Sequence, residues 1–380
     1  MPGMGGGGSA VSDPAVVAAF HAALRDQAAL ALVLAAACVL LWRPLARRRR
    51  RTGRRPTPAA APAEPAARRL LRLGFGALWV ADGLLQTKPE MALGLPRHVV
   101  APAEVGTPGW VHALISPALA SWSAHPVAAA TSVVWVQLAL GAALLLAPRW
   151  RPSRTAGALS AAWAAVVWVF GEAFGGLLGT GGSWLFGMPG AAALYLAAGV
   201  TLALPARSWR GPRLARVTCL ALGTYFASVA VAQAWPGRRF WTGGPDGRLP
   251  AMLHSMALTP QPRPLSSLIR AAAGFASAHG ALTNLVAVVG LGVVASGLLV
   301  AGASRRGSHR ALLVATVVGE VLCLATWVVV QDLGFLGATG TDPSSMPPTA
   351  VVLLAVALAR RTSGPPGGQP RREPTAGLVC

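Results

Sequence analysis

Residues 170–181 read Phe-Gly-Glu-Ala-Phe-Gly-Gly-Leu-Leu-Gly-Thr-Gly, and residues 332–340 read Asp-Leu-Gly-Phe-Leu-Gly-Ala-Thr-Gly. Both glycine-rich stretches follow a long apolar run, and both begin near one carboxyl group, Glu172 or Asp332. A proline then opens a last apolar run, at Pro189 in the first case and Pro348 in the second. A single match of this kind can arise by chance, so its meaning depends on what precedes each stretch.

Two further matches precede the glycine-rich stretches in the same order. Residues 86–89 (Gln-Thr-Lys-Pro) recur as 233–236 (Gln-Ala-Trp-Pro), and residues 123–125 (Ser-Ala-His) recur as 277–279. Three matches at similar separations predict a duplicated four-helix unit, with the repeats at 70–205 and 206–360.

The composition predicts that this unit is embedded in a membrane. Hydrophobic residues make up 54% of the chain, charged residues 12%, and the mean hydropathy is +0.53, which is high for a soluble domain. We therefore expect an all-α integral membrane protein with about nine transmembrane helices, one leading helix plus two parallel four-helix repeats. The expected spans are 27–42, 70–87, 127–147, 157–178, 184–204, 215–235, 281–303, 311–331 and 347–359.

The formal charge of +21 fits membrane orientation better than nucleic-acid binding, because most arginines lie in short loops between apolar runs. The positive-inside rule predicts a multi-pass plasma-membrane protein whose N-terminal segment, 1–42, starts outside and ends with the first helix. The Arg/Pro-rich linker 43–69 and the tail 361–380 are then cytoplasmic and disordered. The linker is expected to lie against anionic lipid, with docking of an acidic partner as the alternative. The preference for Arg over Lys, with abundant Ala, is typical of a GC-rich bacterial genome.

Four carboxyl groups fall inside or at the ends of the expected spans, on Asp82, Glu172, Glu320 and Asp332. A charged side chain at the bilayer centre costs at least ~2.5 kcal/mol, so each group is expected to be protonated, paired or facing a polar cavity. Helix-end hydration and a functional polar site both remain open for these groups.

The repeat places two histidines level with two of the carboxyl groups, which predicts a shared vestibule at the outer helix ends. The candidate catalytic or proton-relay residues are His125, Glu172, His279 and Asp332, and the candidate cofactor-binding residues are Gln86 and Gln233. Structural roles stay open as well, because an interfacial histidine often caps a helix and a glutamine often bonds across helices. No motif indicates a metal site, and no Cys-x-x-Cys occurs. Gly171, Gly175 and Gly179, at four-residue spacing, predict a smooth packing stripe on one helix.

Each half resembles the DoxX-like four-helix membrane proteins. The resemblance rests on residues 69–76 (Arg-Leu-Leu-Arg-Leu-Gly-Phe-Gly) with Gly83 and Pro89, and on 170–172 (Phe-Gly-Glu) with 189–191 (Pro-Gly-Ala). It covers 70–205 well and 216–360 more weakly, since residues 219–223 (Cys-Leu-Ala-Leu-Gly) lack the arginine. It implies a compact helical bundle in the plasma membrane, associated in some members with quinol or thiosulfate oxidation.

Three functions therefore compete at the level of sequence. The first is a redox-associated subunit that interacts with quinone or a partner oxidoreductase. The second is a small-solute or proton-coupled transporter that uses the repeat interface, and the third is a membrane scaffold or assembly factor without chemistry. The sequence does not decide whether the chain is an enzyme.

Overall fold

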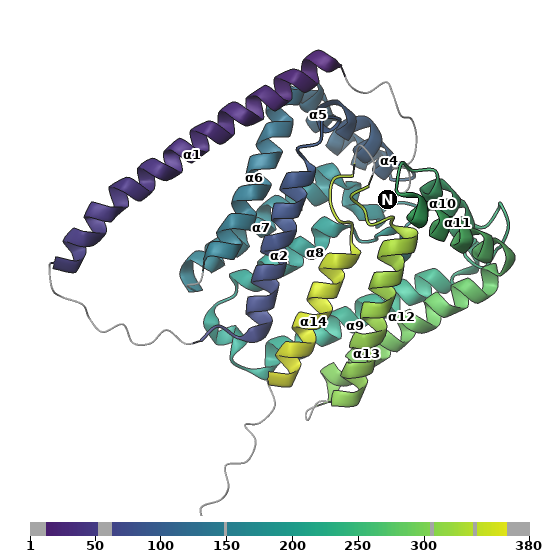
Figure 1. Cartoon of the computed structure of the whole chain (residues 1–380). Helices are drawn as coiled ribbons and strands as arrows, with labels where there is room; N and C mark the ends of the chain where they lie inside the picture. Colours follow the sequence, from purple (N-terminus) through teal and green to yellow (C-terminus); the bar gives the residue numbers. More distant parts are fainter. Residues whose placement is uncertain (1–12, 52–62, 148–149, 305–307, 337–339, 363–380) are drawn as a thin grey trace, which may run out of the picture.

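The computed structural model describes residues 13–51, 63–147, 150–304, 308–336 and 340–362, and these residues form helices and loops without a strand (Figure 1). Five segments are long and apolar enough to cross a membrane. They are Pro14–Val33, Pro126–Leu146, Pro212–Ala234, Gly280–Ala303 and His309–Val330. The chain is therefore consistent with a multi-pass membrane protein.

Eight long helices form the bundle, and a ninth, α1 (Pro14–Arg51), lies along its outside (Figure 1). Residues 66–205 are called the first half and residues 212–362 the second half. The first half contributes α2 (Ala66–Leu85), α6 (Pro126–Leu146), α7 (Trp150–Val166) and α8 (Ala191–Ala203). The second half contributes α9 (Pro212–Ala234), α12 (Gly280–Ala303), α13 (His309–Ala325) and α14 (Met346–Thr362).

Most of the remaining elements gather at one end of the bundle, which we call the loop end (Figure 1). Between α2 and α6 lie α3 (Met91–Gly94), η1 (Leu95–Val100), α4 (Ala101–Glu104) and α5 (Gly109–Ala124). Between α9 and α12 lie η6 (Pro236–Arg238), α10 (Arg248–Ala257) and α11 (Arg263–Ala278). The remaining short turns are η2 (Val167–Gly171), η3 (Ala173–Gly176), η4 (Trp184–Phe186), η5 (Ala206–Trp209) and η7 (Thr326–Val330).

Each of the nine predicted spans overlaps one of these nine helices, but only the five segments named above are long and apolar enough to cross a membrane within the described residues, and three predicted boundaries are wrong. The span 27–42 is predicted too late in the chain, because α1 begins at Pro14 and its apolar stretch is Pro14–Val33. The span 157–178 ends early, because the helix widens into a π-turn and stops at Gly171, after which Phe174 and Gly175 have φ values of 65° and 59°. A left-handed backbone cannot continue a right-handed helix. The expected stripe of Gly171, Gly175 and Gly179 is therefore also wrong. The span 184–204 starts late, at Ala191, because Gly190 has a φ of 96°.

The helices pack as antiparallel neighbours within each half, α2 on α6 and α7 on α8, then α9 on α12 and α13 on α14. Small residues allow the close approach: a Cβ on Gly76 would lie 2.9 Å from Cγ of Leu145, and one on Gly223 would lie 2.8 Å from Cγ of Leu299. The two halves meet where α14 packs on α2 and α8.

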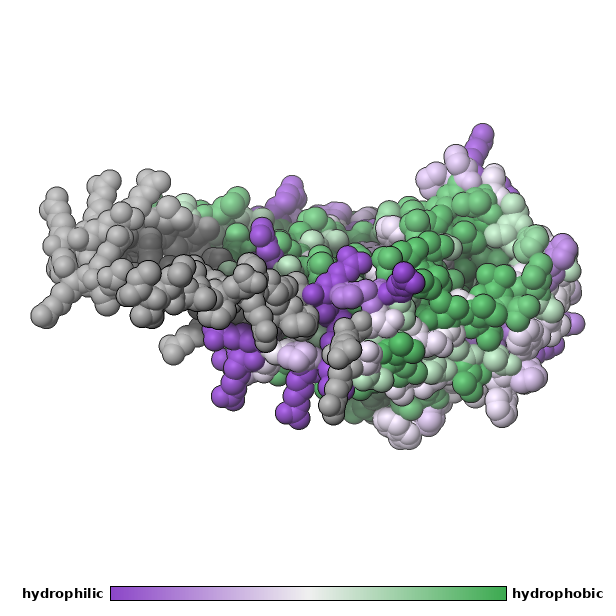
Figure 2. Space-filling model, turned by 90° about the horizontal axis from the view of Figure 1, so that it is seen from below, coloured by the Kyte–Doolittle hydropathy of each residue, from purple (hydrophilic) through white to green (hydrophobic). Residues whose placement is uncertain are grey.

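The outer surface of α12 and α13 is strongly apolar. Figure 2 shows hydrophobic side chains over the side of the molecule on which these helices lie. Their large exposed residues include Leu282, Val286, Val289, Val317 and Val321, the last 61% exposed. An apolar surface of this extent is expected to contact lipid.

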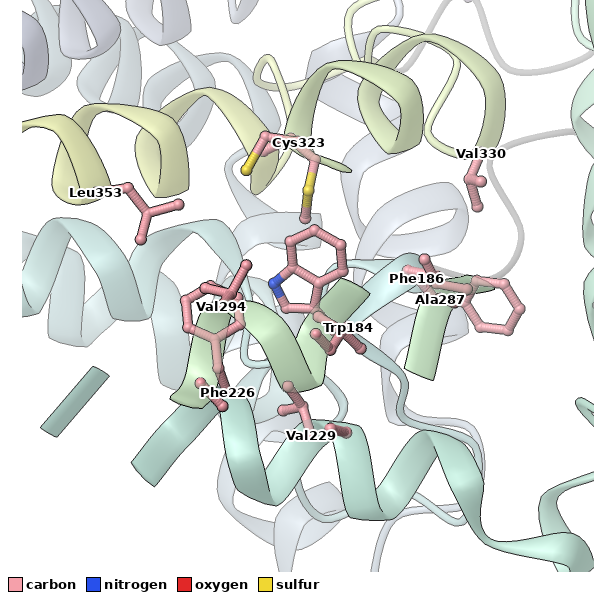
Figure 3. Packing of buried hydrophobic residues seen from close by; sticks show 14 of the residues in the cluster. Trp184, Phe186, Phe226, Val229, Ala287, Val294, Cys323, Val330 and Leu353 are labelled. Atoms are coloured by element: carbon pink, nitrogen blue, oxygen red, sulfur yellow. The ribbon is translucent and has the colours of Figure 1, made fainter. Parts of the chain in front are cut away.

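One segment of the first half is buried in the core of the second. Trp184, 2% exposed, packs with Phe226, Val294 and Cys323, and Figure 3 shows its indole at the centre of this cluster. The first half therefore supplies part of the hydrophobic core of the second half.

Arginines close the end of the bundle opposite the loop end. Arg72, 6% exposed, donates from Nη1 to the carbonyl oxygens of Leu144 (2.7 Å) and Leu145 (3.1 Å) at the end of α6, and it also bonds the Glu64 carboxylate. In the second half, Arg360 donates from Nε to the carbonyl of Ala301 at 3.0 Å. Each arginine satisfies carbonyl groups that a helix C-terminus leaves without partners.

Candidate functional site

The π-turn at the end of α7 places Glu172 against the start of α8. Glu172 is 4% exposed, and its Oε1 and Oε2 accept from the backbone N–H of Ala192 at 3.1 and 3.3 Å. A carboxylate at a helix N-terminus satisfies free N–H groups and interacts favourably with the helix dipole. Gly190 is required beside it, because a Cβ there would lie 2.0 Å from Oε2 of Glu172. Glu172 thus has a structural role as the cap of α8.

The same carboxyl group lines a cavity of about 220 Å³, the outer chamber. Its wall is formed by the glycine-rich loop after Glu172, by α4, by Arg248 at the start of α10 and by the loop before α14. Val105, 75% exposed, and the exposed Thr180 also line it, so the chamber opens among loops at the loop end. Its polar lining residues include Glu172, Thr180, Ser183, Arg248, Asp342 and Ser345.

A second cavity of about 60 Å³, the inner pocket, adjoins the outer chamber. The two cavities share Glu172, Ala191 and Asp342. The inner pocket reaches between α2, α6 and α8, where its polar side chains are those of Asp82, Gln86, Gln137 and Tyr195. Its aromatic wall is Trp79 against Tyr195, with ring centroids 4.5 Å apart in an edge-on arrangement.

Three polar atoms in this pocket are buried without a hydrogen-bond partner among the described residues: Asp82 Oδ1, Gln137 Oε1 and the Tyr195 hydroxyl. The three side chains are 3%, 4% and 2% exposed. The Tyr195 hydroxyl also lies within reach of the Asp82 carboxyl group, and a side-chain hydrogen-bonding interaction between them contributes to the electrostatics of both groups. Buried polar groups in native proteins are nearly always satisfied, so the acceptor capacity that remains on Asp82 and Gln137 around this cavity indicates that the cavity holds water or a ligand.

Asp342 comes from the second half, on the loop between η7 and α14, and the end of α2 holds that loop in place. Lys88 donates from Nζ to the carbonyls of Phe335 (2.6 Å) and Gly340 (3.1 Å), and Gln86 Nε2 donates to the carbonyl of Thr341 at 3.4 Å. The Asp342 carboxylate accepts from Thr341 Oγ1 at 2.8 Å and from the backbone N–H of Ser344. Burial raises the pKa of the Asp342 carboxyl above its ordinary value.

The second half in turn holds a loop of the first half, because residues at and after the end of α9 bond the glycine-rich loop. Ser183 donates from Oγ to Oε1 of Gln233 at 2.7 Å, and Arg238 donates from Nη1 to the carbonyl of Gly182. Arg248 lies over the rings of Phe186 and Phe240, 5.9 Å from each centroid. Both loops that line the outer chamber are thus fixed by the opposite half of the chain.

Of the six candidate residues, the structure brings only Glu172 and Gln86 to a common cavity, the inner pocket. His125 and His279 are exposed at the junctions that precede α6 and α12, and neither lines the outer chamber or the inner pocket. His279 stacks on Phe275 at 4.7 Å. The two cavities therefore bring neither histidine together with Glu172, because each histidine lies at a helix start on the surface.

The other two candidates are buried in separate places. Gln233 donates from Nε2 to Oδ1 of Asn284 at 2.8 Å, which is the cross-helix bond that the sequence allowed. Asp332 is 4% exposed with Oδ1 unpartnered among the described residues, and it lines neither cavity.

Sequence reasoning missed Asp342, Tyr195 and Arg248 as site residues. Asp342 stands in a Thr-Asp-Pro-Ser-Ser segment that is typical of an exposed turn, and Tyr195 is a single polar group in an apolar run. Asp82 was recognised as an expensive membrane carboxyl, but nothing in the sequence joined it to Glu172. Within the described residues, no group of three or more His, Cys, Asp and Glu side chains is arranged to hold a metal ion.

Comparisons of the chain with protein-family models, with curated proteins and with solved structures find no match.

Proposed function

We propose that the two halves are repeats of one four-helix unit, related without inversion. Equivalent backbone features support this proposal. Val167–Gly171 and Thr326–Val330 are both π-turns, and one residue after each comes a run of positive φ, four residues long in the first half (173–176) and three in the second (332–334). The second residue of each turn, Trp168 or Trp327, donates from Nε1 to the carbonyl of a proline before the last helix at 2.8 Å, Pro189 in one half and Pro343 in the other.

The histidine junctions give further support. His125 has φ −134° and ψ 56°, and His279 has φ −130° and ψ 44°. The π-turns set an offset of 159 residues between the halves, in which Glu172 corresponds to Gln331 and Pro189 to Pro348. The pairing of Pro189 with Pro348 expected from sequence keeps this register, whereas that of Glu172 with Asp332 is displaced by one residue. Resemblance to DoxX-like proteins stays a proposal about the ancestry of the repeat.

We further propose that the protein is a proton-coupled transporter for a small water-borne solute, with its binding site in the outer chamber and the inner pocket. The observation that carries the proposal is a pair of adjoining cavities that share Glu172 and Asp342, with Asp82 in the wall of the inner pocket. Sites of this kind in transporters lie at repeat interfaces, and here Asp342 is supplied by the opposite half. A carboxyl group in an apolar surrounding can exchange a proton when a ligand arrives.

The position of the opening favours transport over the redox role. A quinone carries a long apolar tail that needs an opening toward lipid, whereas the outer chamber opens among loops beside Thr180. A scaffold role does not account for unpartnered polar atoms around a cavity. A redox role with a partner oxidoreductase, and a scaffold role, remain as outcomes that the experiment below separates.

The orientation belongs to the same proposal: a bacterial plasma membrane, the loop end outside, the C-terminus inside and the arginine-rich linker against anionic lipid. Cytoplasmic reporters fused after Arg154 and Arg210 are expected to be active, and those after Gly181 and Gly247 silent. Cytoplasmic activity of the Gly247 fusion would overturn this orientation.

The function is tested by reconstituting the purified protein into liposomes that contain a pH-sensitive dye. Amino acids, amines, sugars and carboxylates are added outside in turn, and a solute-linked change of internal pH is expected for one class. Glu172→Gln is expected to abolish the change, and Glu320→Gln, a carboxyl change on α13 outside both cavities, is the matched control and should retain it. No pH change with any class would overturn the transport proposal, and a copurified quinone would then favour the redox role.

A further inference from the structure

We propose that the inner pocket binds a primary ammonium group, so that the transported solute is a small organic amine whose body occupies the outer chamber. This inference rests on the proposed function, whose site it makes chemically specific. It is carried by the charge, the hydrogen-bonding capacity and the size of the inner pocket.

The charge of the site favours a cation. Three carboxyl groups line the inner pocket, and none of its lining residues is Lys, Arg or His. The cation that lines the outer chamber is Arg248, whose guanidinium is placed over the Phe186 and Phe240 rings. A cationic ligand would favour ionisation of the carboxyl groups and pair with them, whereas an anionic ligand would find no opposite charge in the inner pocket.

The unpartnered atoms favour a ligand that donates hydrogen bonds. Asp82 Oδ1 and Gln137 Oε1 are acceptors, and the Tyr195 hydroxyl can accept as well as donate. A primary ammonium group carries three N–H donors and no acceptor, so one such group can donate to Asp82, to Gln137 and to the Tyr195 oxygen, while the Tyr195 hydroxyl donates to Asp82. A quinone head group offers carbonyl acceptors instead and would leave Asp82 Oδ1 and Gln137 Oε1 unpaired.

The size and the walls also fit an ammonium group. A volume of about 60 Å³ is large enough for a few water-sized groups and too small for a sugar or an aromatic ring. Trp79 and Tyr195 form one wall, and aromatic rings attract cations electrostatically. The carboxyl groups are not close enough together to form a metal site within the described residues, whereas an organic cation spans a wider space.

The site is complete only when both halves contribute. Asp82, Gln137 and Tyr195 come from α2, α6 and α8, and Asp342 comes from the loop that Lys88 holds. Glu172 stands between the two cavities, because it lines both. An amine entering from the chamber therefore passes the Glu172 and Asp342 carboxyl groups before its ammonium group reaches Asp82.

Binding is tested on the full-length protein in detergent, by the change of tryptophan fluorescence as n-butylamine hydrochloride is added. Trp79 lines the pocket and reports its occupation. We expect saturable binding of n-butylammonium. Two probes of similar shape are compared: n-butanol, which is uncharged, and n-butyltrimethylammonium, which keeps the charge and lacks N–H donors. Each is expected to bind at least about tenfold more weakly, the factor that ~1.4 kcal/mol gives.

The variant Asp82→Asn is expected to weaken n-butylammonium binding at least about tenfold, and Tyr195→Phe to weaken it less. Asp332→Asn is the matched control, because Asp332 is also a buried carboxyl group with an unpartnered oxygen but lies outside both cavities. Its affinity should equal that of the wild type. If Asp82→Asn does not fold, Tyr195→Phe and the probe comparison decide alone.

Equal affinity for n-butanol and n-butylammonium, or equal loss in Asp82→Asn and Asp332→Asn, would overturn the ammonium assignment. The two proposals fail separately. A solute-linked proton flux with sugars or carboxylates, combined with no amine binding, would overturn the ammonium assignment and support the transport proposal. Specific amine binding without any flux would overturn the transport proposal and support the ammonium assignment.

Discussion

Gly190→Ala is the substitution whose effect can be worked out most completely from the structure. Gly190 has φ 96° and ψ 150°, a conformation that only glycine adopts readily, and forcing alanine into it costs about 1–3 kcal/mol. The new Cβ would also lie 2.0 Å from Oε2 of Glu172. The carboxylate must then move away from the Ala192 N–H, and losing a hydrogen bond to a charged group costs about 1.5–3 kcal/mol. The expected total is about 3–6 kcal/mol.

Gly244→Ala is the matched control. Gly244 also has a positive φ, 66°, but nothing lies within 4 Å of the position of its Cβ. Its cost is therefore limited to left-handed strain, about 1–2 kcal/mol. Titration of both variants with a denaturing detergent, followed by tryptophan fluorescence, measures the difference in free energy of unfolding.

A double-mutant cycle identifies the clash itself. In the Glu172→Ala background the carboxylate is absent, so Gly190→Ala should cost only its backbone strain and the tight contact of its Cβ with the Gly175 Cα at 3.0 Å, and the two changes should be strongly non-additive. Equal costs for Gly190→Ala and Gly244→Ala, or simple additivity with Glu172→Ala, would refute the role of Glu172 as the cap of α8.

Three other predictions concern stability. Trp184→Ala is expected to destabilise the protein by about 3–5 kcal/mol, measured by the same titration, because it empties the centre of an apolar cluster. Arg72→Leu is expected to cost about 3–5 kcal/mol, because it leaves the Leu144 and Leu145 carbonyls without their donor and removes one of the two arginines that bond Glu64. Arg69→Leu, on the exposed side of α2, should change the free energy of unfolding little. Because burial raises the pKa of Asp342, its protonated form is favoured in the folded state. The stability that this group contributes is fully present below the pKa of the unfolded chain, 3.8, and is lost as pH rises through the pKa of the folded state. Wild type should therefore lose stability relative to Asp342→Asn across that window, and a flat difference between the two pH profiles would contradict this.

The apolar runs predicted where the long helices lie, because burial in lipid requires helices that are apolar along their whole length. They could not predict where two of these helices end. Residues 170–180 are mostly apolar, so hydropathy predicts that the helix continues beyond the π-turn. The backbone instead becomes left-handed at Phe174 and Gly175, which ends the helix. The same local reversal places Glu172 at the start of α8 and creates the wall of the outer chamber.

The site itself was only partly predictable, since its members are far apart in sequence. Glu172 and Gln86 were found because polar residues at the ends of apolar runs are unusual. Asp342 lies in the same pocket because Lys88 binds the loop before α14. A contact between segments so far apart in the chain cannot be predicted from hydrophobic periodicity. The histidines misled because a matched position in a repeat indicates a matched backbone, here the junctions before α6 and α12, and does not by itself indicate shared chemistry.

The exchange of loops between the halves has a consequence for how the chain assembles. Trp184, from the first half, fills the core of the second, while Asp342, from the second half, completes the pocket of the first. In a fragment ending near Pro205, the loop that carries Trp184 would lack the hydrophobic residues that bury it, and the inner pocket would lack Asp342. Neither half is therefore a self-sufficient folding unit, and the whole bundle is expected to unfold cooperatively. On the proposed duplication, a single four-helix unit could not have closed this pocket alone, because Asp342 reaches the pocket from the other half.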